Sequence, residues 1–185
     1  MDRLPPGQRW VHKPQVLHYG GVPEVRLDEW TLSITGLVDK PLALDWSAFS
    51  TMPMQKTARD FHCVTGWSAM DVEWEGVDFT GIAALAGAAR QARFVMFGCL
   101  GGYTTNVPLE ALSNGDALLA VAMNGARLSP EHGAPVRLVV PSKYAWKSAK
   151  WVSSIEFMAN DRPGFWESNG YHNNGDPWEE ERYSR

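Results

Sequence analysis

The sequence predicts an α+β protein in which short strands form mixed β-sheets together with a few short helices. Eight segments have strand character, shown by alternation of apolar and polar residues or by a continuous apolar run. Helical signals are brief, and strands and helices do not alternate as they do in a doubly wound fold. The 185 residues, 44% hydrophobic and 21% charged, suffice for one globular domain over residues 1–185.

The two ends of the chain differ from its middle. Residues 1–24 are rich in Pro and Gly and lack periodicity, so we expect an extended arm that lies across the domain. Residues 160–185 are rich in aromatic and turn-forming residues, and this composition does not build a separate core. We therefore expect an irregular tail that packs on the same domain.

The expected strands lie between the arm and the tail. They cover residues 30–36, 42–44, 56–63, 71–74, 92–99, 117–123, 136–140 and 151–157. Glu75-Gly76 predicts a turn, and Asn124-Gly125 predicts a hairpin because both residues accept positive φ. The polar segments 101–106 and 142–150 are expected to be loops.

The expected helices are short and begin at capping or helix-starting residues. Asp45 caps a helix that runs to about Thr51, and Thr80 caps one that runs through Leu85 to Ala88. Pro108 begins a helical turn.

Charge and hydropathy narrow the possible partners. The net charge is −4 and the Lys and Arg residues are dispersed, which indicates no nucleic-acid partner. No segment approaches the roughly 18 apolar residues that a membrane span requires. The first residues show neither an apolar signal segment nor a twin-arginine pair, so we expect a cytoplasmic location.

The chain has two cysteines, Cys63 and Cys99. A structural disulfide is not expected in the cytoplasm, the spacing does not fit a zinc site, and most free cysteines are buried packing residues. Cys63 differs because it ends a strand-like segment and is followed by the small residues Thr65 and Gly66, which let a cofactor approach. Its thiolate would suit a soft metal whose other ligands come from that cofactor.

A group of cationic and hydroxyl residues follows further along the chain. Arg137 lies in an expected strand, and Lys147, Ser148 and Lys150 follow in a loop. Together they could form an anion pocket suited to a phosphate. The same residues also fit a solvated basic loop in which Arg137 pairs with a carboxylate.

Three segments carry a resemblance to a known family. These are Phe61-His62-Cys63, the stretch from His132 to Pro141, and Lys147-Ser148-Ala149-Lys150-Trp151. Their order and spacing resemble the molybdopterin-binding domain of sulfite oxidases, of bacterial methionine sulfoxide reductase catalytic subunits and of small stand-alone bacterial proteins. The resemblance covers residues 14–158, and the tail at 164–183 is similar to that of the stand-alone proteins.

This resemblance implies the sulfite oxidase molybdopterin-binding fold and an oxidoreductase that transfers an oxygen atom or two electrons. It implies a molybdenum–molybdopterin cofactor without an attached nucleotide, with one molybdenum per chain. Cys63 would be the metal ligand, and Tyr103 falls where sulfite oxidases carry an active-site tyrosine; an ordinary loop aromatic is the alternative for Tyr103. The implied cofactor-binding residues are His18, Phe61, His62, Cys63, His132, Arg137, Lys147, Ser148, Ala149 and Lys150.

The sequence departs from sulfite oxidases where these bind sulfite. They follow the cysteine with Ala-Gly-Asn-Arg-Arg, whereas this chain has Val64-Thr65-Gly66-Trp67-Ser68, and Val16 replaces another arginine. A sulfite dianion needs such cations, because an unpaired charge in a dry pocket is costly. We therefore expect a small-molecule substrate other than sulfite, such as a sulfoxide or an N-oxide.

The chain leaves no residues for a haem domain, so a separate electron-transfer partner is expected. Two further hypotheses fit the sequence. One is a non-catalytic module that binds or carries molybdopterin. The other is a cofactor-free scaffold whose Trp-rich surface binds a protein; the chain has nine Trp.

Overall fold

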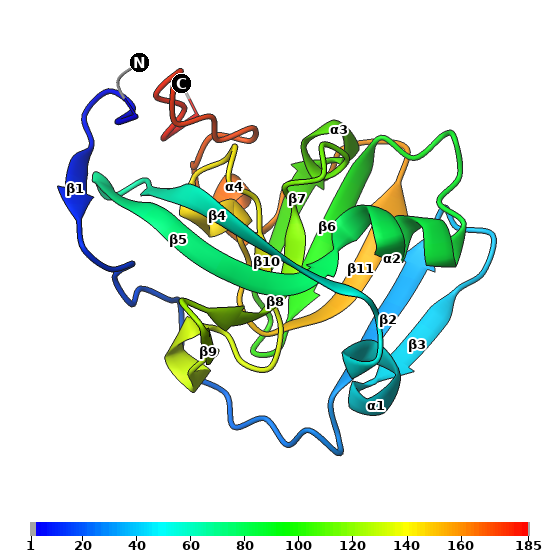
Figure 1. The fold of residues 1–185 in the computed structure, drawn as a ribbon. Coiled ribbons are helices and arrows are strands. Elements are labelled where there is room, and N and C mark those ends of the chain that lie inside the picture. Colours follow the sequence, from blue (N-terminus) through cyan, green and yellow to red (C-terminus); the bar gives the residue numbers. More distant parts are fainter. Residues whose placement is uncertain (1–2, 185) are drawn as a thin grey trace.

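Two β-sheets carry most of the regular backbone of the computed structural model, which describes residues 3–184 (Figure 1). Met1 and Asp2 of the expected arm and Arg185 of the expected tail lie outside the described residues. The first sheet contains β1 (Arg9–Val11), β4 (Met54–Cys63), β5 (Trp67–Asp78), β8 (Leu118–Met123), β9 (Ala126–Arg127) and β10 (Arg137–Val139). The second contains β2 (Thr31–Gly36), β3 (Leu42–Asp45), β6 (Phe94–Cys99), β7 (Thr104–Pro108) and β11 (Val152–Met158).

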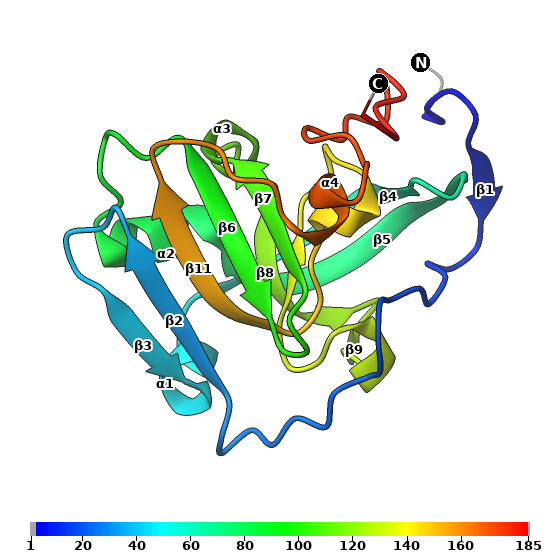
Figure 2. The ribbon, with the colours of Figure 1, turned by 180° about the vertical axis from the view of Figure 1, so that it is seen from behind.

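Both sheets are mixed. The first has the order β1-β5-β8-β10, with β4 also paired to β5 and β9 to β8; the second has the order β3-β2-β11-β6-β7 (Figure 2). The pairs β1–β5 and β2–β11 are parallel and the other strand pairs are antiparallel. The predicted α+β class with mixed sheets is confirmed.

Short helices connect the strands. The α-helices are α1 (Trp46–Ser50), α2 (Phe79–Ala86), α3 (Leu109–Leu112) and α4 (Phe165–Ser168), and the 3-10 helices are η1 (Pro130–His132) and η2 (Ala145–Lys147). The Asp45 carboxylate caps α1 as predicted, accepting a hydrogen bond from the Ala48 amide at 2.7 Å. For α2 the predicted cap is wrong: Asp78 is the N-cap and accepts from the Thr80 amide at 2.9 Å.

Two apolar clusters fill the interior. The larger draws buried side chains from both sheets and from α2, including Leu32, Phe79 and Phe157. The second lies where the β4–β5 hairpin meets the segment around η2, and it contains Phe61 and Tyr144. Because Cys63 belongs to this second cluster, the thiol is held in a rigid, largely apolar environment.

Two local predictions are wrong because pairing between strands overrides turn propensity. Glu75-Gly76 forms no turn; β5 continues through it, with an irregularity in its register with β8. A Cβ atom at Gly76 would lie 2.3 Å from the Leu119 carbonyl oxygen, so the glycine permits close approach of two strands. Residues 104–106, expected in a loop, begin β7 because they pair with β6. The predicted hairpin is confirmed: Asn124 (φ 51°) and Gly125 (φ 77°) join β8 to β9.

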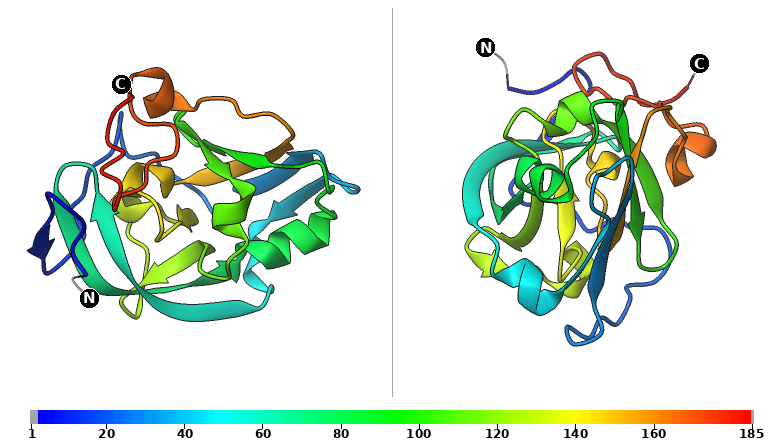
Figure 3. Two further views of the ribbon diagram at one scale, coloured as in Figure 1. Left: turned by 90° about the horizontal axis from the view of Figure 1, so that it is seen from above. Right: turned by 90° about the vertical axis from the view of Figure 1, so that its right-hand side faces the viewer.

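The arm and the tail meet at one end of the molecule. The described parts of the arm and the tail, drawn in dark blue and red, lie beside the tip of the β4–β5 hairpin in Figures 1 and 2 and in the left view of Figure 3. Arg182 of the tail donates a hydrogen bond to the Pro6 carbonyl at 3.2 Å, which joins the two ends directly. The end of β4 lies beside this junction, since Arg182 also donates to the Val64 carbonyl.

Candidate active site

A cavity of about 290 Å³ forms where the arm, the end of β4, the segment from β10 to β11 and the tail converge. The structure brings nine of the eleven expected site residues into its lining: His18, Phe61, Cys63, Tyr103, His132, Arg137, Ser148, Ala149 and Lys150. Six aromatic side chains outside the expected set of site residues also line it: Tyr19, Trp67, Trp146, Trp151, Trp166 and Tyr171. These residues line the same cavity and therefore make one candidate site.

Cys63 contributes a nearly buried thiol to the cavity, with 7% of the residue exposed. The Thr65 hydroxyl donates a hydrogen bond to Sγ at 3.2 Å. Burial raises the pKa of the Cys63 thiol, whereas the hydroxyl and amide of Thr65 lower it by stabilising the thiolate. Gly66, at φ 89°, allows the tight turn that leads from β4 into β5.

The anion group consists of His132, Arg137, Ser148, Ala149 and Lys150, and it brings positive charge together without a carboxylate. No Asp or Glu lines the cavity among the described residues. Burial lowers the pKa of Arg137 to about 10, and burial followed by the charge of Arg137 lowers the pKa of Lys150 to about 7. Burial and the two neighbouring cations likewise lower the pKa of His132. Such a group favours an anionic ligand that would neutralise it.

Backbone geometry holds the anion group together. The Arg137 guanidinium donates to the carbonyls of His132 at 3.1 Å and Ser148 at 3.0 Å. A Cβ atom at Gly133 would lie 2.9 Å from Cβ of Lys150 and 3.1 Å from Cβ of Arg137, so only glycine lets the η1 turn pack this closely. The described residues offer no hydrogen-bond acceptor to the backbone amides of Ala149 and Lys150, which leaves two more donors for an anion.

His18 brings the arm over the cavity. Its ring makes an edge contact with Trp151 at 5.6 Å between centroids, and its Nδ1 lies 3.0 Å from the Gly20 carbonyl. Lys150 donates to the Leu17 carbonyl at 3.0 Å, so a residue of the anion group also holds the arm.

Tyr103 lines the cavity, but its hydroxyl has another partner. It donates to the Trp146 carbonyl at 2.7 Å, and burial raises the pKa of the phenol well above its usual value. Tyr171, from the tail, lines the same cavity, and its hydroxyl has no hydrogen-bond partner among the described residues. Its ring packs against Trp166 at 4.9 Å and Trp146 at 5.2 Å. The phenol that can donate to a ligand is therefore that of Tyr171, which the sequence did not single out.

Two expected cofactor-binding residues are not in the lining. His62 points to the opposite side of β4 from Phe61 and Cys63, where its Nδ1 lies 2.7 Å from the Ser68 hydroxyl. Lys147 is fully buried, and its Nζ lies 2.6 Å from Oε1 of Glu167. Strand alternation explains the first departure and a buried ion pair the second, so we do not carry these two residues into the proposed site.

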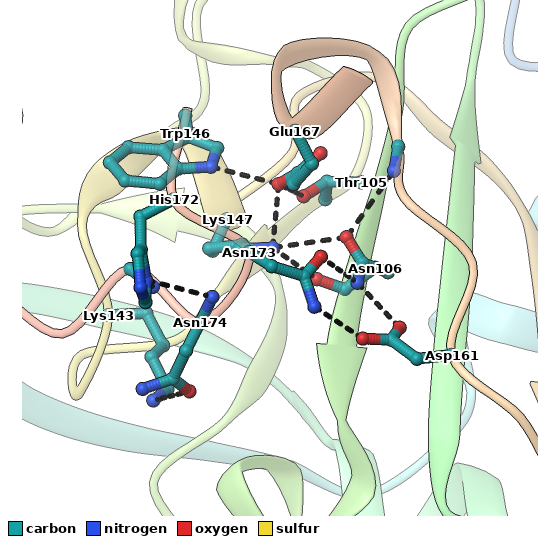
Figure 4. A network of polar contacts seen from close by, with 12 residues as sticks. Thr105, Asn106, Lys143, Trp146, Lys147, Asp161, Glu167, His172, Asn173 and Asn174 are labelled. Carbon is teal, nitrogen blue, oxygen red and sulfur yellow. Dashed lines mark hydrogen bonds and ion pairs between the residues drawn. The ribbon is translucent and has the colours of Figure 1, made fainter. Parts of the chain in front are cut away.

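Lys147 belongs to a buried polar network that ties the tail to β7 and η2 (Figure 4). Oε1 of Glu167 also accepts hydrogen bonds from Trp146 Nε1 and Thr105 Oγ1, each at 2.9 Å. Lys147 Nζ donates further to the backbone carbonyl of Asn106 at 2.8 Å. The network fixes the indole of Trp146, which lines the cavity, and thereby uses Lys147 for structure.

The residues present fit a molybdenum–molybdopterin cofactor. Among the described residues no group of three or more His, Cys, Asp or Glu could hold a metal ion, so a metal here needs most of its ligands from a cofactor. Cys63 supplies one soft thiolate ligand, and the anion group suits the phosphate of the pterin.

The chain matches a known family over most of its length. The model of the family described as oxidoreductase molybdopterin binding domain matches residues 19–166. The chain is 44% identical over 183 residues to the uncharacterized oxidoreductase YuiH of Bacillus subtilis strain 168, covering 98% of this chain and 92% of that protein.

Longer proteins are also similar. Identity is 31% over 157 residues to the putative protein-methionine-sulfoxide reductase subunit YedZ1 of Azospira oryzae, and 32% over 156 residues to the protein-methionine-sulfoxide reductase catalytic subunit MsrP of Campylobacter jejuni. The alignments cover 83% and 75% of this chain but only 59% and 52% of these two proteins. The sulfane dehydrogenase SoxCD of Paracoccus pantotrophus superposes with a TM-score of 0.73 at 22% identity, over 87% of this chain and 47% of that chain.

The SoxCD likeness shows the fold, and the family match confirms the predicted family. None of the described helices is long and apolar enough to cross a membrane. The chain belongs to the oxidoreductase molybdopterin binding domain family: it is an oxidoreductase with a molybdenum–molybdopterin cofactor.

Proposed function

We propose that this enzyme reduces a small neutral oxo compound, a sulfoxide or an N-oxide, at a molybdenum centre bound by Cys63. The observation that carries the proposal is the division of the cavity lining into two groups. The anion group holds the positive charge. The thiol group, defined as Cys63, Trp67, Trp146, Trp166 and Tyr171, contains aromatic walls and one free phenol around the thiol.

The composition of the thiol group argues against sulfite. Trp67 lines the cavity where sulfite oxidases are expected to carry an arginine, and Val16 is 45% exposed and does not line it. A sulfite dianion beside these apolar walls would lose hydration without gaining the arginines that sulfite oxidases are expected to supply there. A neutral sulfoxide places its alkyl groups against the indoles and needs one hydrogen-bond donor for its oxygen.

The named relatives support the same direction. Two of them are designated protein-methionine-sulfoxide reductase subunits, and both align with the greater part of this chain. This chain spans only about half the length of these proteins, so we carry over the class of substrate, a sulfoxide, and not their assembly.

The proposed roles follow from the contacts of each residue. Arg137, Lys150 and His132, with the amides of Ala149 and Lys150, bind the cofactor phosphate in its nucleotide-free form, one molybdenum per chain; His18 and Phe61 cover the pterin. When bound, the cofactor supplies two-electron chemistry coupled to movement of an oxygen atom. Tyr171 donates a hydrogen bond to the substrate oxygen, and the three indoles exclude water.

Reduction of a sulfoxide consumes two electrons and two protons and yields a sulfide and water. We propose that a separate electron-transfer protein supplies the electrons. We also propose that the arm and tail form one domain with the two sheets, because Gln8 of the arm and Arg182 of the tail donate hydrogen bonds to the carbonyls of Cys63 and Val64. A cytoplasmic location stays a prediction that cell fractionation would test.

An assay with artificial electron donors and acceptors tests the substrate class. We expect turnover of dimethyl sulfoxide, methionine sulfoxide or trimethylamine N-oxide with reduced viologen as donor. We expect little oxidation of sulfite with ferricyanide as acceptor. Faster turnover of sulfite than of every neutral oxo compound would contradict the proposal.

A further inference from the structure

The loop that carries the metal ligand is held from outside by both ends of the chain. We call residues 63–66 the ligand loop. Gln8 Nε2 donates to the Cys63 carbonyl at 3.1 Å, and the Arg9 amide donates to the Gly66 carbonyl at 2.9 Å. Arg182 Nη1 donates to the Val64 carbonyl. Three of the four carbonyls in the loop are thus bound by the arm or the tail.

Several contacts hold the Arg182 side chain in place. Its Nη2 donates to the Pro6 carbonyl at 3.2 Å, and its guanidinium lies over the Tyr144 ring at 5.3 Å. Its side chain is 19% exposed. Gly7 adopts φ 67°, and a Cβ atom there would lie 3.0 Å from Arg182 Nη2. The glycine therefore lets the arm approach the guanidinium closely, so that one Nη atom binds the Val64 carbonyl and the other the Pro6 carbonyl.

The backbone of Arg182 is tied to the segment that carries Tyr171. The Arg182 carbonyl accepts a hydrogen bond from the His172 amide at 3.2 Å, and Tyr183 forms a β-bridge with Tyr171. The Tyr171 and Tyr183 rings meet edge to face at 5.3 Å. One residue therefore contacts the ligand loop with its side chain and the Tyr171 segment with its backbone.

We propose that Arg182 and Gln8 are positioning residues that clamp the ligand loop against the Tyr171 segment, and so fix the Cys63 sulfur relative to the Tyr171 hydroxyl. This rests on the proposed function, in which Cys63 binds the metal and Tyr171 meets the substrate. Neither residue lines the cavity, and both lie outside the range 19–166 that matches the family model. Displacement of a reacting group by about 1 Å can lower a rate by about a hundredfold, so a short loop benefits from such a clamp.

Hydrogen exchange of the full chain, purified without cofactor, tests the contact itself. In Arg182→Gln we expect the amides of residues 64–66 to exchange about tenfold faster, because a charge-assisted hydrogen bond is lost. Arg182→Lys keeps the charge but not the two-pronged donor and should lie between wild type and Arg182→Gln. The control Arg162→Gln removes an exposed arginine that pairs with Glu156 and should leave this loop unchanged.

The holoenzyme tests the consequence. We expect Arg182→Gln to shift the visible absorption of the thiolate-bound cofactor and to lower kcat about tenfold or more with little change in KM. Gln8→Met should act in the same direction and replaces Arg182→Gln if that variant does not fold. Loop exchange or absorption unchanged from wild type, with only a lowered Tm, would overturn the proposal. If wild type binds no molybdenum, the proposed function fails, and the exchange rates alone decide whether the clamp exists.

Discussion

The anion group and the thiol group line one cavity but are assembled differently. The anion group lies within residues 132–150, in one stretch of chain between η1 and β11. The thiol group comes from the end of β4, the start of β5, η2 and the tail. The first group is a sequence motif with local geometry, whereas the second exists only after distant segments pack together. Binding of the cofactor phosphate should therefore depend on the first group, and ligation of the metal together with selection and chemistry of the substrate on the second.

The largest expected effect concerns the anion group. Arg137→Met should abolish retention of the cofactor, because it removes a buried guanidinium at the phosphate site. The same variant without cofactor should lose only a little stability, because removal of a desolvated charge that has no carboxylate partner offsets part of the cost of leaving the His132 and Ser148 carbonyls without their donor. Metal analysis and thermal unfolding of both forms check this, with exposed Arg162→Met as control. An Arg137→Met protein that retains its full molybdenum content would show that cofactor binding does not depend on the anion group.

The next effect separates two lysines that are adjacent in the motif. Lys147→Met strands the buried Glu167 carboxylate and should cost about 3–5 kcal/mol of unfolding free energy in urea. Lys150→Met should cost far less, because Lys150 has no carboxylate partner in the cavity, but it should release the cofactor. Equal loss of stability in both variants would mean that Lys147 has no special structural role.

A smaller effect distinguishes the two tyrosines. Tyr171→Phe should lower kcat/KM for a sulfoxide about a hundredfold by removing one donor to the reacting oxygen. Tyr103→Phe should leave kcat/KM nearly unchanged and cost about 1 kcal/mol of stability, because the buried Trp146 carbonyl loses its partner. Steady-state kinetics and denaturation of both variants decide between them, and the reverse pattern would restore Tyr103 as the active-site tyrosine.

The last effect is the pH dependence that Lys150 contributes, which solvent screens because this lysine is only partly buried. Its pKa is about 7 in the folded chain, whereas an unfolded lysine has a pKa of about 10.4, so the unfolded state binds more protons between these values. For the chain without cofactor, this group therefore makes the unfolding free energy rise as pH increases from about 7 towards 10. Lys150→Met should flatten that rise relative to wild type in urea titrations at several pH values. A slope that does not change would show that Lys150 is not desolvated.

The two groups also differ in how well the sequence predicts them. The cations of the motif and the thiol of Cys63 were predicted from local pattern and family resemblance. The structure places Cys63 and three of the four predicted cations, His132, Arg137 and Lys150, in the lining. The exception, Lys147, could not be distinguished from Lys150 by sequence, because its partner Glu167 lies in a tail with no strong periodic signal. Tyr171 was missed for the same reason, since only tertiary packing brings the tail to the cavity.

The fold shows the same limit. Strands with clear alternation, such as β2, and the Asn124-Gly125 hairpin were predicted because their signals are local. The length of β5 was underestimated because Gly76 looks like a turn in sequence and acts as a close contact with β8 in the structure. Pairing between strands distant in sequence decided such cases.

The two cysteines provide the most direct test of the metal site. Cys63 lines the cavity, whereas Cys99 is buried, does not line it, and has its pKa raised to about 12 by burial. Molybdenum content and the visible spectrum should be measured for wild type, Cys63→Ala and Cys99→Ala after expression in a host that makes the cofactor. We expect a thiolate-to-molybdenum band in wild type and Cys99→Ala and its loss in Cys63→Ala. A band that persists in Cys63→Ala, or a wild type without molybdenum, would contradict the assignment of Cys63 as the metal ligand.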